Sequence, residues 1–172
     1  SVAGEPWPLP NPFGRVPVLQ HGEFRLYETA AIALYVDEAF DGPPLQPASV
    51  RERARMQQWM STLSAYFYPP MIHSLVHERV VFPELGIEPD EAVAREAVPK
   101  VERALAVLER ELEDGRPFIV NGEPTLADYF LLPTLTSLAF AREGKALLAA
   151  SPRVGAWLAR MGELPHVARF RA

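Results

Sequence analysis

Residues 11–32 constrain this chain most, because their pattern predicts two short strands that lead directly into a helix. Residues 16–19 are β-branched and apolar apart from one proline, and residues 21–22 (His-Gly) supply a turn. In residues 24–27, apolar Phe and Leu alternate with other side chains, as in a half-buried strand. Pro17 cannot donate to a strand ladder, so we expect it at the end or edge of the first strand.

Two spaced motifs in this stretch carry a family resemblance. Asn-Pro-Phe-Gly-Arg-Val-Pro-Val-Leu occupies residues 11–19, and Glu-Thr-Ala-Ala-Ile follows at residues 28–32. The pair resembles the glutathione-binding half of a glutathione S-transferase, and is most similar to the phi class. The resemblance extends over nearly the whole chain, to about Phe170, and the spaced pair is far more specific than Val-Pro alone.

The resemblance implies an α/β thioredoxin-like N-terminal domain, partial in this sequence, followed by an all-α helical bundle. We expect the glutathione-binding domain over residues 1–42 and the helical domain over residues 49–172. The proline-rich segment between them, residues 43–48, is the predicted linker.

Glutathione is an extended tripeptide with one ammonium group, two carboxylates and one thiol. The family implies a cis Val16–Pro17 bond, which would turn the Val16 N–H and C=O outward to pair with the cysteinyl backbone. Glu28 would accept from the γ-glutamyl ammonium group, and Thr29 would offer a hydroxyl and a helix N-terminal N–H to a carboxylate. Arg15 lies next to Val16 and would reach a ligand carboxylate.

Each of these residues also has an ordinary structural interpretation. Pro17 fits a trans edge-strand proline, Thr29 fits a simple N-cap, and Glu28 fits a solvated acid at a helix N-terminus. Their combination at this spacing favours the ligand site. Two residues depart from the family pattern: Thr29 replaces the usual Ser, and Arg15 replaces the usual Gln or Lys of phi-like members.

The part of the chain before these strands is short. Residues 1–10 are proline-rich and are predicted to form a loop. A complete thioredoxin-like half begins with a β-α-β unit of roughly 30 or more residues. We therefore expect either a truncated chain or a unit that the sequence does not record. The family's catalytic Ser, Tyr or Cys lies in that unit, so the catalytic residue is unknown.

Beyond residue 48 the pattern is helical. Ser49 and Glu52 have the spacing of a capping box, and apolar residues recur at helical spacing over residues 56–67. Residues 69–70 (Pro-Pro) predict a kink or a break. In the resembling family this helix walls the electrophile pocket and contributes to a dimer interface. Core packing is the alternative for at least one of the three candidate pocket residues, Tyr66, Phe67 and Met71.

Three further helices are predicted. One opens at residues 89–90 (Pro-Asp), and another at residues 151–152 (Ser-Pro). Thr125 and Asp128 have capping-box spacing before a nearly apolar stretch, which predicts a helix surrounded by others. A catalytic role for Asp128 is weaker than a structural capping role.

Composition and missing motifs exclude several classes. The formal charge of −5 and the absence of a basic cluster argue against nucleic-acid binding, and the absence of Cys removes disulfides and thiolate ligands. His73 and His77 lie four residues apart without a third ligand, which favours surface histidines over a metal site. Hydrolase and nucleotide-binding glycine motifs are missing. No secretory signal or apolar run near 18 residues is present, so we expect a cytoplasmic protein without a membrane partner.

The leading hypothesis is a detoxifying glutathione transferase that conjugates glutathione sulfur to small hydrophobic electrophiles. Glutathione is then the co-substrate, no metal is needed, and the resemblance implies a homodimer. A glutathione-dependent isomerase or dehalogenase is a neighbouring alternative. A non-catalytic glutathione-binding or assembly module, as in the gamma subunit of a translation elongation factor, is the alternative from another class. The sequence does not identify the electrophile.

Overall fold

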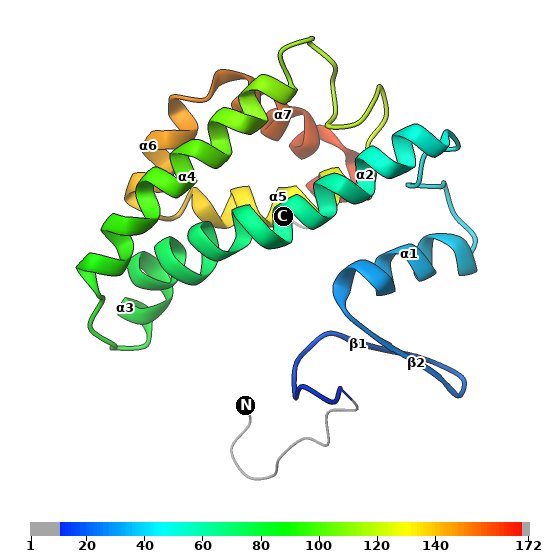
Figure 1. Ribbon diagram of the computed structural model, residues 1–172, viewed down its shortest axis with the longest axis horizontal. Helices are drawn as coiled ribbons and strands as arrows, with labels where there is room; N and C mark the ends of the chain where they lie inside the picture. Colours follow the sequence, from blue (N-terminus) through cyan, green and yellow to red (C-terminus); the bar gives the residue numbers. More distant parts are fainter. Residues whose placement is uncertain (1–10, 170–172) are drawn as a thin grey trace. The chain divides into compact units, whose positions relative to one another are not determined.

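The computed structural model describes residues 11–169, so the loop predicted over residues 1–10 lies outside the described part. The chain forms two compact units that divide between Gln46 and Pro47 (Figure 1). The first unit is a small α/β structure, and the second is entirely helical.

The first unit begins with a β-hairpin, as predicted. Strand β1 (Val18–His21) pairs antiparallel with β2 (Phe24–Tyr27), with Val18 opposite Tyr27. The two strands are joined by a two-residue turn whose first residue, Gly22, has φ 61°. Tight hairpin turns require a positive φ at this position, which glycine adopts without a steric penalty.

Helix α1 (Thr29–Ala39) follows the hairpin and contacts β2, which confirms the predicted helix. Tyr35 of α1 joins the elements: its hydroxyl lies 2.8 Å from His21 Nδ1, and its ring centre lies 5.1 Å from that of Phe24. Packing is incomplete, because Phe24 is still 49% exposed and no residue of α1 is fully buried within the described chain.

The second unit opens with four successive helical segments: α2 (Val50–Thr62), η1 (Leu63–Phe67), η2 (Pro69–Val81) and α3 (Phe82–Glu84). Segments η1 and η2 are π-helical, and the Tyr68 N–H donates to the Leu63 carbonyl five residues back. The chain therefore stays helical through Pro69 and Pro70, where a kink or a break is expected from sequence. A change in hydrogen-bond spacing accommodates the two missing proline donors.

The capping box predicted at the start of α2 does not form. Ser49 is the N-cap residue, but its side chain makes no capping hydrogen bond. Glu52 instead accepts a hydrogen bond from Asn121 Nδ2 at 3.3 Å, across 69 residues of sequence. Glu52 therefore binds Asn121, which is distant in sequence, and not its neighbour Ser49.

The remaining helices are α4 (Glu91–Glu111), α5 (Leu126–Leu138), α6 (Arg142–Ala149), α7 (Pro152–Glu163) and α8 (Pro165–Ala168). Asp90 caps α4 by accepting from Ala92 N at 2.8 Å and Val93 N at 3.3 Å, which confirms the predicted start. Sequence analysis did not identify α6 as a separate helix.

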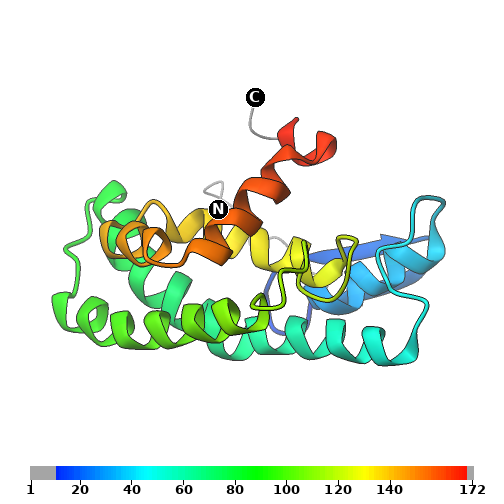
Figure 2. The ribbon, with the colours of Figure 1, turned by 90° about the horizontal axis from the view of Figure 1, so that it is seen from above.

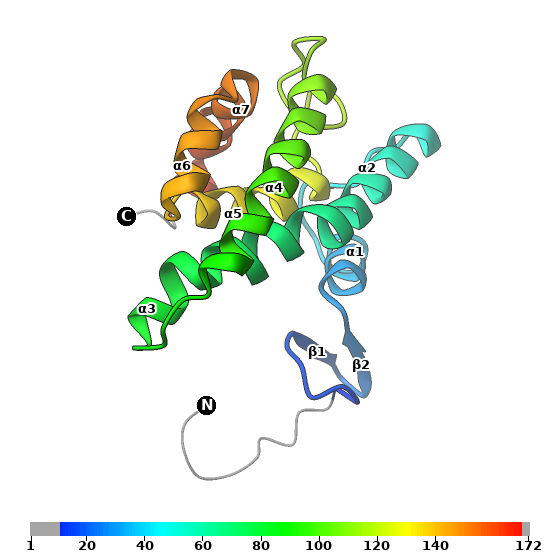
Figure 3. The same cartoon turned by 60° about the vertical axis from the view of Figure 1, so that its left-hand side comes forward.

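Helix α5 is the central element of the helical unit, as predicted. It contacts α2, η1, η2 and α7, and Figures 2 and 3 show it between the long helices and the C-terminal ones. Seven of its thirteen residues are buried. The largest fully buried side chains of the described chain include Trp157, Phe67, Met56, Met71 and Leu131.

Asp128, in the first turn of α5, is the polar centre of this core. Its Oδ2 accepts from Thr125 N at 2.8 Å and Thr125 Oγ1 at 3.0 Å. Its Oδ1 accepts from Ile119 N and Trp157 Nε1, both at 2.9 Å. Burial raises the pKa of the Asp128 carboxyl, and these four donors oppose that effect. The contacts support the structural capping role over the catalytic one.

A second polar link joins three helices on the outside of the unit. The guanidinium of Arg79, on η2, donates to both carboxylate oxygens of Glu91 at 2.7 and 2.8 Å. It also donates to Glu143 of α6 at 2.9 Å. The hydrogen bond from Arg79 lowers the pKa of Glu91 below its usual value. Bidentate geometry makes this pair more specific than a typical surface ion pair.

Over residues 11–169, none of the helices has both the length and the apolar character needed to cross a lipid bilayer.

The first stability prediction concerns Asp128. An Asn at this position keeps one acceptor oxygen but turns an amide N–H₂ toward two donors. Because unsatisfied buried donors are costly, we expect Asp128→Asn to lower the free energy of unfolding by about 2–4 kcal/mol. Asp114→Asn, at an exposed ion pair of the same unit, should cost under about 1 kcal/mol. Equal small losses in urea unfolding would contradict the anchoring role of Asp128.

The second stability prediction concerns Gly144 of α6. A Cβ atom there would overlap the Leu138 backbone carbonyl oxygen, and Gly144 is buried. We expect Gly144→Ala to destabilise the protein by about 1–3 kcal/mol through overpacking. Gly155 of α7 is the matched control, because a Cβ meets nothing within 4 Å there. Gly155→Ala should stabilise by about 0.5–1 kcal/mol, and thermal unfolding that ranks the two variants the other way would refute the close contact.

Candidate functional site

The predicted glutathione-site residues meet at the open end of the hairpin. Val18 pairs with Tyr27, so the residues just outside this pair, Pro17 and Glu28, lie side by side. The β1–β2 register therefore brings together the two motifs through Pro17 and Glu28, which are eleven residues apart in sequence. The residues gathered at this end are Arg15, Val16, Pro17, Glu28 and Thr29.

Val16 presents its backbone at this end. The Val16–Pro17 bond is cis, as the family resemblance implies, and Pro17 directly precedes β1 at the predicted strand end. The Val16 side chain is 75% exposed. Within residues 11–169, no hydrogen bond joins the Val16 N–H or C=O to another residue. An extended peptide would find an unpaired donor and acceptor here, as at a sheet edge.

A compact turn positions the segment before Val16. Asn11 Oδ1 accepts from Phe13 N at 2.8 Å, and the Asn11 carbonyl accepts from Gly14 N at 2.9 Å. Phe13 packs edge-on against Tyr27 of β2, with ring centres 6.1 Å apart. Sequence analysis missed this positioning role. The signal was present, since Asn at the first and Gly at the fourth position favour a type I turn.

Glu28 has an uncommon backbone conformation. Its φ of 72° and ψ of 119° make it the one non-glycine residue with positive φ in the described chain. Such a conformation costs of the order of 1–3 kcal/mol and is concentrated at functional sites. The Glu28 carbonyl accepts from Ile32 N at 3.0 Å, the first hydrogen bond of α1. The backbone of Glu28 is thereby fixed at the helix entrance, and its side chain is exposed.

The N-terminus of α1 lies beside this carboxylate. Thr29 begins the helix, and the N-cap residue Glu28 makes no side-chain capping hydrogen bond. Among the described residues, the N–H groups of the first turn therefore remain available, and the helix dipole makes them a favourable site for an anion. Arg15 is exposed and forms no ion pair within residues 11–169. The site thus combines acceptors for a cation with donors for anions.

The predicted pocket residues lie in the helical unit, where the structure separates them. Tyr66 and Phe67 line a groove of about 610 Å³ between η1 and α4, together with Lys100 and Arg103. The Tyr66 side chain is 70% exposed, whereas the Phe67 side chain is buried in the core. Met71 is fully buried and does not line the groove. Tyr66 is therefore the exposed candidate for substrate contact, whereas the burial of Phe67 and Met71 fits the core-packing alternative.

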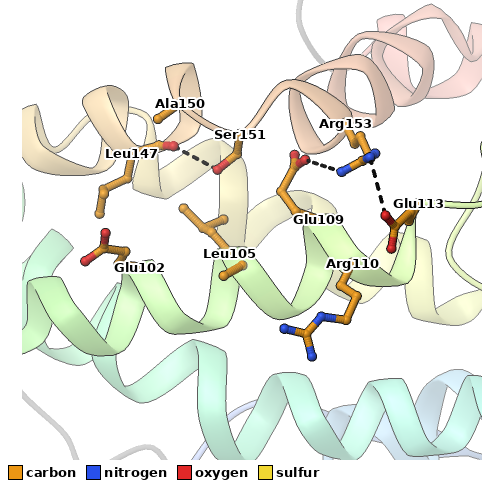
Figure 4. Close-up of a pocket in the computed structure, with 10 residues that line it drawn as sticks. Glu102, Leu105, Glu109, Arg110, Glu113, Leu147, Ala150, Ser151 and Arg153 are labelled. Carbon is orange, nitrogen blue, oxygen red and sulfur yellow. Dashed lines mark hydrogen bonds and ion pairs between the residues drawn. The ribbon is translucent and has the colours of Figure 1, made fainter.

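A second groove, of about 430 Å³, lies between α4 and the α6–α7 connection (Figure 4). Its polar groups mainly bind one another. Glu109 accepts from Val154 N at 2.8 Å and pairs with Arg153 at 3.5 Å. Ser151 Oγ donates to the Leu147 carbonyl at 2.9 Å. These contacts join α4 to α7 and indicate a structural role.

In the part of the chain that the structure describes, no three or more His, Cys, Asp or Glu side chains gather as metal ligands.

Comparison with known proteins identifies the family of both units. Residues 5–38 match the model of the glutathione S-transferase N-terminal domain. Residues 90–160 match the model of the glutathione S-transferase C-terminal domain.

Curated relatives agree with these matches. Glutathione S-transferase 4 of Zea mays is 34% identical, over 93% of this chain and 72% of its own length. A glutathione S-transferase of Hyoscyamus muticus is 32% identical, over 90% of this chain and 73% of its own length. Glutathione S-transferase F14 of Arabidopsis thaliana is also 32% identical, and the match covers 90% of this chain and 62% of the length of that relative.

Comparison with solved structures indicates the same family. The structure of glutathione S-transferase III in its apo form matches with a TM-score of 0.83 and 32% identity, over 92% of this chain and 73% of that one. The similarity confirms a partial thioredoxin-like unit followed by a helical domain, and the F-type relatives confirm the phi-like resemblance. This chain belongs to the glutathione S-transferase family.

Proposed function

We propose that the open end of the hairpin binds glutathione, and that the protein is a transferase that joins glutathione sulfur to small hydrophobic electrophiles. The observation that carries this proposal is the convergence of the Val16 backbone, which has no hydrogen-bond partner within residues 11–169, the constrained Glu28 and the start of α1, which Glu28 does not cap. These groups match the chemistry of an extended tripeptide with one ammonium group and two carboxylates.

Each group has a distinct role in the proposed complex. The Val16 N–H and C=O pair with the cysteinyl backbone as one additional strand would. Glu28 accepts from the γ-glutamyl ammonium group in a charge-assisted hydrogen bond. The Thr29 hydroxyl and N–H hold the neighbouring carboxylate at the helix N-terminus. Arg15 binds the second carboxylate, and Pro17 fixes the turn that presents Val16.

Two solved relatives support the reaction class. A structure of glutathione S-transferase I bound with lactoylglutathione matches with a TM-score of 0.82 and 26% identity. A structure of glutathione S-transferase I from maize in complex with an atrazine glutathione conjugate matches with a TM-score of 0.81 and 26% identity. In both structures the bound glutathione carries a second group, which is the product type of the proposed reaction.

In the proposed reaction, the glutathione thiol loses its proton to solvent and the sulfur attacks an electrophilic carbon. With a chlorotriazine, a C–S bond forms, the C–Cl bond breaks and chloride leaves. A free thiol has a pKa of about 8.5, so a transferase must favour the thiolate. No residue of this sequence is assigned to that task, and no metal is required.

The remaining parts of the proposal follow the family. Residues 1–42 form the glutathione-binding domain, residues 43–48 the linker and residues 49–172 the helical domain. Of the three candidate pocket residues, Tyr66 provides exposed surface for the electrophile in a groove lined mainly by apolar atoms, and Phe67 and Met71 support it from the core. We also propose a cytoplasmic homodimer with a role in detoxification.

The binding test replaces Glu28. Because a hydrogen bond to a charged group contributes about 1.5–3 kcal/mol, Glu28→Ala should weaken glutathione binding roughly ten- to hundredfold in isothermal titration calorimetry. Ala keeps the same backbone restriction at φ 72°, so the folded structure should be retained, which circular dichroism checks. Glu23→Ala, at the exposed hairpin turn, is the matched control and should bind like the wild type.

Unchanged affinity in folded Glu28→Ala would reject the binding site. Release of chloride from a chlorotriazine, measured on the same samples with glutathione, separates the transferase from the binding module. Turnover that falls with the Glu28 substitution supports the transferase. Glutathione binding without chloride release would instead support a non-catalytic module.

A further inference from the structure

Two grooves flank the long helix α4, and their charges differ. The groove beside the α6–α7 connection is lined by three glutamates and two arginines, and one of these arginines, Arg153, pairs with Glu109 and Glu113 at 3.5 and 4.0 Å (Figure 4). The η1–α4 groove, of about 610 Å³, is lined by the cations Lys100 and Arg103. No Asp or Glu is among the described residues that line it.

The two cations of the η1–α4 groove are uncommitted. Within residues 11–169, neither Lys100 nor Arg103 forms an ion pair or a side-chain hydrogen bond. They are three positions apart on α4, so their side chains share one face of the helix. The chain as a whole carries a formal charge of −5, and a groove with charge of a single, positive sign is a local exception that concentrates anions.

The other wall of this groove is apolar and flat. It is formed by η1 and the start of η2, which contribute the 70% exposed ring of Tyr66 and the rings of Pro69 and Pro70. An exposed aromatic face favours an offset-stacked aromatic ligand. The volume of the groove falls within the range of about 300–1,000 Å³ that is typical of small-molecule sites.

We propose that the electrophile of this protein is a flat organic anion. Its apolar ring packs against Tyr66, and Lys100 and Arg103 donate to its carboxylate. The proposal rests on the transfer reaction proposed above and narrows its substrate class. Lys100 and Arg103 determine specificity and take no part in bond making, since a neutral electrophile fills the same groove but leaves both cations unpaired.

Two matched probes isolate the contribution of charge. Dinitrobenzoate and dinitrobenzene, both with their nitro groups meta to each other, differ only in the carboxylate. With chlorine between the nitro groups, each probe becomes an electrophile. The glutathione sulfur then forms a C–S bond at that carbon, the C–Cl bond breaks, chloride leaves with the electron pair, and the thiol proton passes to solvent.

The first test titrates the full chain with the chlorine-free probes in a calorimeter. We expect dinitrobenzoate to bind more tightly than dinitrobenzene. Because exposed ion pairs are weak, Lys100→Gln and Arg103→Gln should each lower the affinity for dinitrobenzoate roughly two- to fivefold, and the double variant roughly tenfold, without changing the affinity for dinitrobenzene. The matched control is Arg95→Gln, which removes an exposed cation of α4 that does not line the groove and should bind both probes like the wild type.

Two further measurements separate charge from packing. Raising the salt concentration from about 0.01 M to about 1 M should weaken only the binding of dinitrobenzoate, because it shortens the screening length from about 30 Å to about 3 Å. Tyr66→Ala should instead weaken the binding of both probes, by roughly three- to tenfold, through the loss of stacking.

NMR locates the site and identifies a competing occupant. Dinitrobenzoate should shift the backbone N–H signals of Ala65, Tyr66 and Ala104, which line the groove. The proposal is overturned if both probes bind equally, if Arg95→Gln weakens binding as much as Arg103→Gln, or if the shifts fall elsewhere. It is also overturned if dilution without a probe moves the same signals, since a second copy of the chain would then cover the groove.

Chloride release separates this proposal from the transfer reaction itself. The two chlorinated probes differ in intrinsic reactivity, so the informative quantity is the ratio of their kcat/KM values. Lys100→Gln and Arg103→Gln should each lower this ratio in favour of the neutral probe, and an unchanged ratio overturns the proposed specificity alone. No release from either probe rejects the transfer reaction, while the binding comparison still confirms or overturns the selectivity of the groove for anions.

Discussion

The helical unit depends on one buried carboxylate. Asp128 accepts four hydrogen bonds, and these come from the segment before α5, from the N-cap of α5 and from Trp157 on α7. A buried carboxylate is tolerated only when its oxygens are satisfied, so this arrangement admits little displacement of the three segments. It places α5 where it contacts the long α2–η2 path, and that path presents Tyr66 and Phe67 to their groove.

The hairpin unit shows the opposite pattern. Within residues 11–169, the Val16 backbone has no hydrogen-bond partner, the N–H groups of the first turn of α1 have no side-chain cap, and Glu28 has an unfavourable φ. Core groups such as Asp128 are satisfied because stability requires it, whereas these groups are left open beside one another. Unsatisfied polar groups and backbone strain at one end of a hairpin are what a ligand with complementary charges would use.

Local patterns predicted the elements that local contacts determine. The hairpin and α1 follow from the turn at Gly22 and from alternation, and the box at the start of α5 joins residues only three apart. Long-range contacts were beyond such patterns: Glu52 binds Asn121 rather than Ser49. The prolines at 69–70 do not break the helix, because packing against α4 and α5 favours a continuous path. The positive φ of Glu28 has no signature in residue type, since glutamate is not enriched in that conformation.

The central claim, that the hairpin end and the start of α1 form one glutathione site, is tested most directly by a ¹⁵N–¹H NMR titration of the full chain with glutathione. The account predicts saturable shifts of the backbone N–H signals of Val16, Thr29 and Ala30, with one common dissociation constant. Signals at the far end of the hairpin, including Gly22, should stay in place. Shifts confined to other parts of the chain, or none at millimolar glutathione, would contradict the site.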